Sequence, residues 1–219
     1  MGKVIHIGKR FSAIGSFIAI ASSLLQLFSA VGLIPHPGNL YLFFLPSLIL
    51  APAFLITTIC FDIPAHDSSR KCTITSWVLA TINCTMLIMV FCSHPGVLNP
   101  SGFDWQTGSL GYLAFAHHTT PVNMKYASCI LISASTFTLA FALRNHKPKS
   151  LFRSLLMNGL MLPLLVVSYI YPKYYFLASP WIVTFPFALF HVARFFTTEE
   201  RKLQKKAKTN NNPLEWVIR

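Results

Sequence analysis

Two adjacent histidines, His117 and His118, lie in an otherwise apolar and aromatic stretch of the chain, GYLAFAHHTTPVN. Imidazole and carboxylate groups are suitable ligands for a zinc-like cation, and three protein ligands plus a water make a hydrolytic site. His94 and Asp104 belong to the same connecting segment, so these four side chains form a candidate metal site. A membrane-embedded, metal-dependent hydrolase or lipid-modifying enzyme is therefore one hypothesis for this chain.

The spacing of these four residues weakens the metal hypothesis. The chain contains no HExxH pattern, which would place two histidines on one face of a helix. On a helix, adjacent residues such as His117 and His118 point about 100° apart. The alternative is that the histidines lie at a membrane surface and bond to head groups and water. That alternative favours a non-enzymatic protein without a cofactor.

The composition indicates which kind of structure must position these residues. Of the 219 residues, 53% are hydrophobic and 11% are charged, whereas soluble domains carry about 25% charged residues. A helix of about 20 apolar residues crosses the hydrocarbon core of a bilayer. The chain therefore predicts an all-α, polytopic membrane protein with six transmembrane helices in one bundle. The predicted spans, each free of Asp, Glu, Lys and Arg, are residues 11–34, 40–61, 73–93, 126–143, 154–171 and 175–193.

The basic residues predict the orientation. Of the 18 Lys and Arg residues, all except Lys125 and Lys173 fall before the first span, in the even-numbered connections or after the last span. Short loops rich in Lys and Arg stay in the cytoplasm. The sequence thus predicts that both termini are cytoplasmic, in a membrane that it does not specify.

The domain organisation that follows is simple. Residues 1–196 form the six-span domain, and residues 197–219 form a basic cytoplasmic tail that is expected to be largely disordered. The net charge of +12 indicates an attraction of this tail to anionic lipid head groups. Nucleic acid is not an expected partner, because the charges are divided among the flanks of a membrane protein, whereas a second membrane protein is an open alternative.

Three amides lie within the predicted spans: Gln26, Asn83 and Asn158. A buried amide in a membrane needs a partner on another helix, so these residues are either packing contacts between helices or the lining of a polar cavity. The second interpretation predicts a protein that binds or moves a lipid or a small amphipathic molecule. A role within a membrane complex is the other form of the non-enzymatic hypothesis.

The five cysteines show no metal-binding spacing. Cys92 and Cys129 both fall near the predicted outer ends of spans, where a disulfide between them is one alternative and apolar packing is the other.

Overall fold

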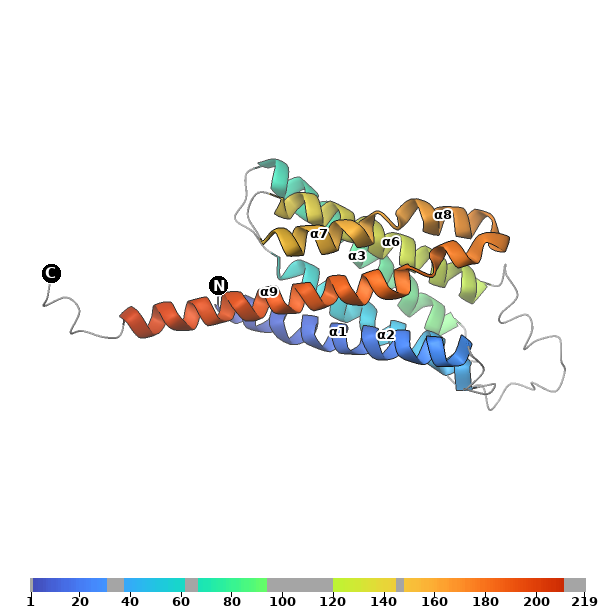
Figure 1. Cartoon of the computed structure of the whole chain (residues 1–219), viewed down its shortest axis with the longest axis horizontal. Coiled ribbons are helices and arrows are strands. Elements are labelled where there is room, and N and C mark those ends of the chain that lie inside the picture. The colour runs from blue at the N-terminus through green and yellow to red at the C-terminus, as the bar shows by residue number, and fades with distance from the viewer. Residues whose placement is uncertain (1, 31–37, 62–66, 94–119, 145–147, 211–219) are drawn as a thin grey trace, which may run out of the picture.

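In a computed structural model of the chain, residues 2–30, 38–61, 67–93, 120–144 and 148–210 are described (Figure 1). This part of the chain is all-helical and has no strands. Its elements in chain order are α1 (Gly2–Ala30), α2 (Gly38–Ile59), α3 (Asp67–Ser93), α6 (Thr120–Leu143), α7 (Lys149–Gly159), α8 (Leu162–Ile170), the 3₁₀ helix η2 (Pro172–Ala178) and α9 (Trp181–Asn210).

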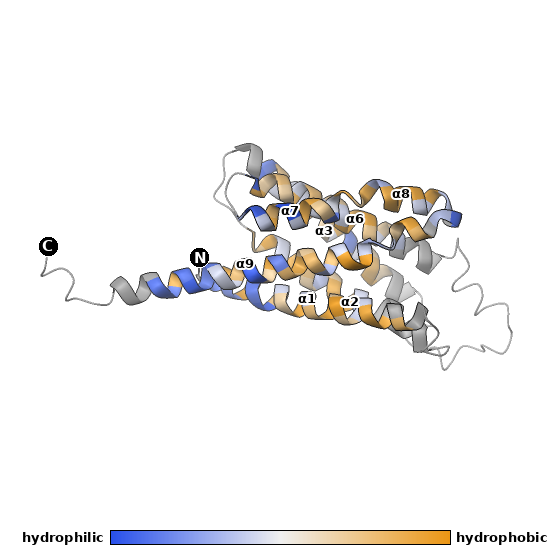
Figure 2. Cartoon of the chain, viewed as in Figure 1, coloured by the Kyte–Doolittle hydropathy of each residue, from blue (hydrophilic) through white to orange (hydrophobic). Residues whose placement is uncertain are grey.

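Five helical segments are long and apolar enough to cross a membrane, by length and composition. A shorter apolar helix, Pro46–Ile59, covers much of the second predicted span. Large apolar side chains also point outward from the bundle, with Phe17 74% exposed and Val183 68% exposed. Soluble proteins rarely expose so much apolar surface, and lipid is the solvent that suits it. Hydrophobic residues run along α2, α8 and the part of α9 that lies in the bundle, whereas the far part of α9 is hydrophilic (Figure 2). These features are those of an integral membrane protein. The five segments are Lys3–Leu25, Arg70–Met89, Tyr126–Leu143, Lys149–Ile170 and Phe176–Lys205.

The fifth predicted span is divided into two helices, α7 and α8. Pro163 has no N–H and cannot donate to the carbonyl group of Gly159 four residues earlier. The chain passes through a turn at Leu160 and Met161, and the Leu165 N–H resumes helical bonding by donating to the Met161 carbonyl at 3.0 Å. The sequence marks Pro163 as a potential kink, and the structure places the break just before it.

The helices pack as neighbouring pairs. α3 lies against α6, α1 against both α2 and α9, and α7 against α6 and α9. Two of these contacts require glycine. A Cβ atom on Gly8 would lie 2.7 Å from the Phe196 ring, and one on Gly159 would lie 2.6 Å from the Cβ of Phe137. Small residues at such positions let helix backbones approach closely inside a membrane.

A cluster of aromatic and aliphatic side chains closes the bundle at the end where α1 begins. The ring of Phe61 lies 4.8 Å from that of Phe196 and stacks on that of Phe195 at 5.6 Å. Leu139 and Leu143 of α6 belong to the same buried cluster. The cluster therefore joins α2, α6 and α9 at this end.

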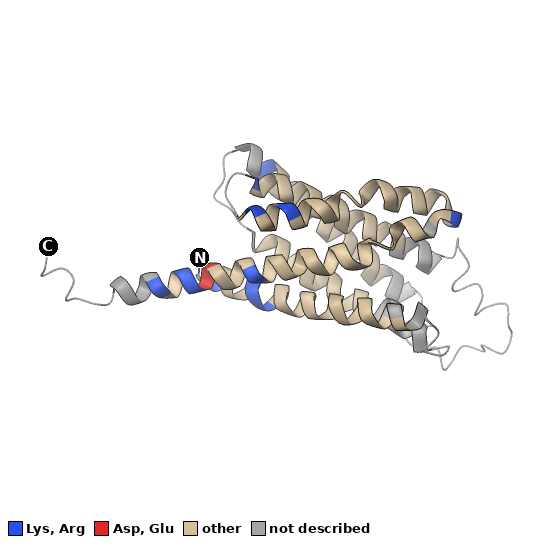
Figure 3. Cartoon of the chain, viewed as in Figure 1, with Lys and Arg blue, Asp and Glu red and all other residues tan. Residues whose placement is uncertain are grey.

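Most of the described Lys and Arg positions gather at this same end of the bundle (Figure 3). Lys173 belongs to η2, between α8 and α9. The apolar part of α9 ends at Phe196, but the helix continues to Asn210. The sequence instead predicts a largely disordered tail from Thr197. The helix continues because TTEERKLQKKAK contains good helix formers and no Gly or Pro. The attraction of this segment to anionic head groups stays a prediction.

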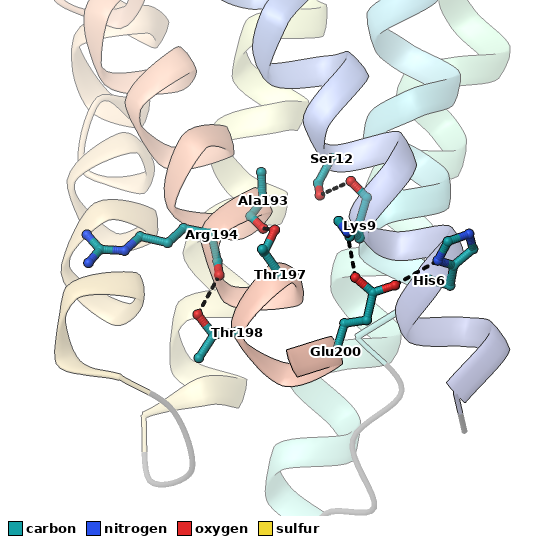
Figure 4. Close-up of polar contacts among 8 residues, drawn as sticks. All are labelled: His6, Lys9, Ser12, Ala193, Arg194, Thr197, Thr198 and Glu200. Carbon is teal, nitrogen blue, oxygen red and sulfur yellow. Dashed lines mark hydrogen bonds and ion pairs between the residues drawn. The ribbon is translucent and has the colours of Figure 1, made fainter. Parts of the chain in front are cut away.

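At the end of the bundle where α1 begins, an ion pair joins α9 to α1. Glu200 accepts hydrogen bonds from Lys9 Nζ at 2.6 Å, and its other carboxylate oxygen lies 2.8 Å from His6 Nδ1 (Figure 4). These residues lie beyond the apolar parts of both helices. Lys9 and then His6 hold the pKa of Glu200 below its ordinary value. The carboxylate is therefore ionised at neutral pH and pairs with the first turns of α1, near the far end of the antiparallel α1–α9 contact.

Candidate functional site

A small cavity lies among α1, α2, α3, α6 and α9, at a distance from the charged end. Thirteen residues line it. One of them, Ser22 of α1, follows Lys9 by 13 residues, which is about 20 Å along the helix. The cavity volume is about 30 Å³, which is room for about two water-sized groups. The lining residues are Ala19, Ser22, Ser23, Ser47, Leu50, Ala51, Leu87, Ser128, Cys129, Ile132, Trp181, Ile182 and Phe185.

The polar part of the cavity wall consists of hydroxyl groups. Four serines contribute to it, from α1 (Ser22 and Ser23), α2 (Ser47) and α6 (Ser128). Ser23 Oγ donates to the carbonyl oxygen of Ile182 at 2.8 Å, which joins α1 to the first turn of α9. No Asp, Glu, Lys, Arg or His lines the cavity within the part of the chain that the structure describes. Such a wall suits a neutral polar group.

An aromatic pair forms the α9 side of the cavity. The rings of Trp181 and Phe185 stack at 4.8 Å with an interplanar angle of 11°. The indole Nε1–H of Trp181 donates to Ser133 Oγ on α6 at 3.0 Å, so the ring is held in one orientation. Phe185 is 1% exposed and also meets the Phe54 ring edge-on at 6.0 Å. These contacts make the wall rigid and apolar beside the serines.

Asn83 lies in the interior of α3 and is fully buried, at 0% exposure. Neither its amide nitrogen nor its carbonyl oxygen has a hydrogen-bond partner among the described residues. A buried carboxamide without a partner costs about 1–3 kcal/mol, and native structures rarely leave both of its atoms in this state.

Asn158 in α7 is buried as deeply, but both its amide nitrogen and its carbonyl oxygen are hydrogen-bonded. Its Nδ2 donates to Thr136 Oγ1 of α6 at 2.9 Å, and its Oδ1 accepts a hydrogen bond from Thr184 Oγ1 of α9 at 3.2 Å. Thr136 in turn donates to the Ser133 carbonyl at 3.0 Å. Asn158 thus joins three helices, and it is not among the residues that line the cavity.

The sequence groups Gln26, Asn83 and Asn158 as a ligand cavity. Asn83 and Asn158 lie in different environments, one without a partner and one in a network, and the Gln26 side chain lies outside the described residues. The assignment of these three residues to one ligand cavity stays a prediction. The polar lining of the cavity is instead formed by four serines, none of which is among the three amides.

The candidate metal ligands His94, Asp104, His117 and His118 all fall outside the described residues. Within residues 2–30, 38–61, 67–93, 120–144 and 148–210, no group of three or more His, Cys, Asp or Glu side chains could hold a metal ion. The zinc-like site therefore stays a prediction. The same holds for a disulfide between Cys92 and Cys129, because the Cys92 side chain is also outside the described set.

No protein-family model, curated protein or solved structure matches this chain.

Proposed function

We propose that this chain is a non-enzymatic integral membrane protein whose helical bundle binds or moves a lipid or a small neutral amphipathic molecule. One observation supports the proposal above the others: a cavity with four serines on one side and Trp181, Phe185 and aliphatic side chains on the other, inside a bundle of apolar helices. Hydroxyl groups beside an apolar wall match a molecule with one neutral polar end.

The size of the cavity limits what enters it. Space for about two water-sized groups accommodates one neutral polar group and the carbon next to it, but not a whole lipid. The rest of the ligand would lie along the apolar helices, in contact with the bilayer. In the proposed topology, with six spans and both termini in the cytoplasm, the cavity belongs to the outer half of the membrane.

The proposal is tested by native mass spectrometry of the protein purified in lipid nanodiscs. A neutral lipid adduct is expected on the wild type. Ser47→Phe fills the cavity from α2 and should abolish the adduct, whereas Ile49→Phe, on the exposed face of the same helix, should keep it. Both variants are first checked for a monodisperse elution profile. An adduct that persists in Ser47→Phe, or a wild type without any adduct, contradicts the proposal.

A further inference from the structure

Asn83, whose carboxamide has no partner among the described residues, does not itself line the cavity but lies one turn from Leu87, which does. Ala80, Asn83 and Leu87 share one face of α3, since they are spaced by three and four residues. Ala80 packs in a cluster with Leu50 and Ile132, and Leu87 lines the cavity beside these same two residues. Asn83 therefore lies between Ala80, which packs against two residues of the cavity wall, and Leu87, which is part of that wall.

The chemistry of the carboxamide defines what would satisfy it. Its Nδ2 has two N–H donors and its Oδ1 is an acceptor, and all of them lack a partner among the described residues. A hydroxyl group both donates and accepts, so one hydroxyl can serve both sides of the amide. An ether or ester oxygen only accepts. A charged group would lose its hydration in this cavity, and no charged side chain among the described lining residues could pair with it. Its burial would therefore be unfavourable.

We infer that Asn83 is the specificity-determining residue of this cavity and that it selects an amphipathic alcohol. For the ligand to reach the amide, the Leu87 side chain, which lines the cavity one turn from Asn83, would have to move aside. The hydroxyl then bonds to the carboxamide, with the serines around it. The carbon next to the hydroxyl lies beside Trp181 and Phe185, and the rest of the chain extends along the apolar helices. This inference rests on the proposed function, because it needs the cavity to admit a ligand.

The test uses two photoreactive probes with the same chain, hexadecanol and hexadecyl methyl ether, each with a diazirine near the oxygen. They are added to the full-length protein in nanodiscs, and labelled peptides are mapped by mass spectrometry. In the wild type the alcohol should label cavity residues about five-fold more than the ether, the ratio expected from one extra hydrogen bond. Asn83→Leu should bring this ratio close to one, whereas Thr85→Leu, on the exposed face of α3, should keep it.

A second measurement separates ligand selection from a purely structural role. Leucine has nearly the shape of asparagine, and replacing an unpartnered buried amide by an apolar group of the same shape is neutral or stabilising. Asn83→Leu should therefore unfold at a temperature equal to or above that of the wild type. An alcohol preference retained in Asn83→Leu, or no preference in the wild type, overturns the inference but leaves the proposed function standing. If neither probe labels the cavity in any protein, the proposed function itself fails.

Discussion

Lys9 Nζ lies 2.6 Å from Glu200 Oε2, and this contact joins the first and last helices across 191 positions of the chain. The Glu200 side chain is 16% exposed, and the Lys9 side chain is 38% exposed. The pair lies just beyond the apolar parts of α1 and α9. It therefore forms the polar end of the α1–α9 interface, which is more extensive than the α7–α9 interface.

The contribution of this contact to stability should depend on pH. Because the pKa of Glu200 is lowered in the folded protein, the contribution is present above the ordinary value near 4.5 and is lost as the pH falls through the lowered pKa. Glu200→Gln should therefore unfold at a lower temperature than the wild type at neutral pH, and the difference should vanish in acid. Glu199→Gln is the matched control, since Glu199 pairs with Lys202 one turn away in the same helix. Equal unfolding temperatures for all three proteins at neutral pH would show that the contact contributes nothing.

The network around Asn158 should stabilise the bundle measurably. Asn158→Leu removes two interhelical hydrogen bonds, each worth about 0.6 kcal/mol and at most about 1.7 kcal/mol in membrane proteins. Chemical unfolding in mixed micelles should thus show a loss of roughly 1–2 kcal/mol. Asn83→Leu makes the same chemical change at a position without partners and should show no loss. If the two variants lost equal stability, the contrast between the two amides would be wrong.

Two glycines should respond in opposite ways to the same substitution. Gly159→Ala places a Cβ 2.6 Å from the Cβ and 2.8 Å from the backbone Cα of Phe137, so helices α6 and α7 must separate. Such overpacking costs about 1–3 kcal/mol. Gly15→Ala places its Cβ at an ordinary 3.6 Å from Ala53 and should stabilise α1 by up to about 1 kcal/mol. Thermal unfolding of both variants checks the pair, and a stabilising Gly159→Ala would contradict the packing described for α7.

The proposed orientation predicts which side of the membrane each end of the bundle faces. In a background without the five native cysteines, Ser150→Cys should react with a membrane-impermeant maleimide only after permeabilisation. Lys173→Cys should react without permeabilisation in sealed vesicles whose cytoplasmic face points inward, whichever membrane they come from. Both positions are exposed, so access to the side chain is not limiting. Reaction of both from the same side would exclude the arrangement in which α7 and α8 cross the bilayer together.

The sequence predicts the helices well where hydrophobicity alone defines them and less well where they end. Charge-free runs are easily found, but α6 begins at Thr120, before the predicted start at 126, and α9 extends far past residue 193. Helical backbone continues into polar residues as long as these are good helix formers, and hydropathy does not register this. The turn before Pro163 is signalled by the proline, but the close contact of Gly159 with Phe137 depends on another helix.

The candidate site was less predictable for a related reason. Asn83 and Asn158 are the same residue type in similar apolar surroundings. Only the structure shows that Asn158 has hydrogen-bond partners whereas Asn83 has none among the described residues. The partners of Asn158, Thr136 and Thr184, lie 22 and 26 positions away on other helices. The cavity serines come from three helices and have no common spacing in the sequence, so no linear pattern indicates that they meet.

The most direct test of ligand binding uses Trp181 as a reporter in the cavity wall. Single-tryptophan proteins are prepared that retain either Trp181 or Trp77, whose Nε1 donates to the Thr58 carbonyl at 2.8 Å and which does not line the cavity. A brominated long-chain alcohol is titrated into nanodiscs that contain each protein. Saturable quenching of Trp181, abolished by Ser47→Phe, with only weak and linear quenching of Trp77, is the predicted result. Linear quenching of both tryptophans to the same extent would mean that the alcohol reaches them only from the bulk lipid, and it would contradict a binding cavity.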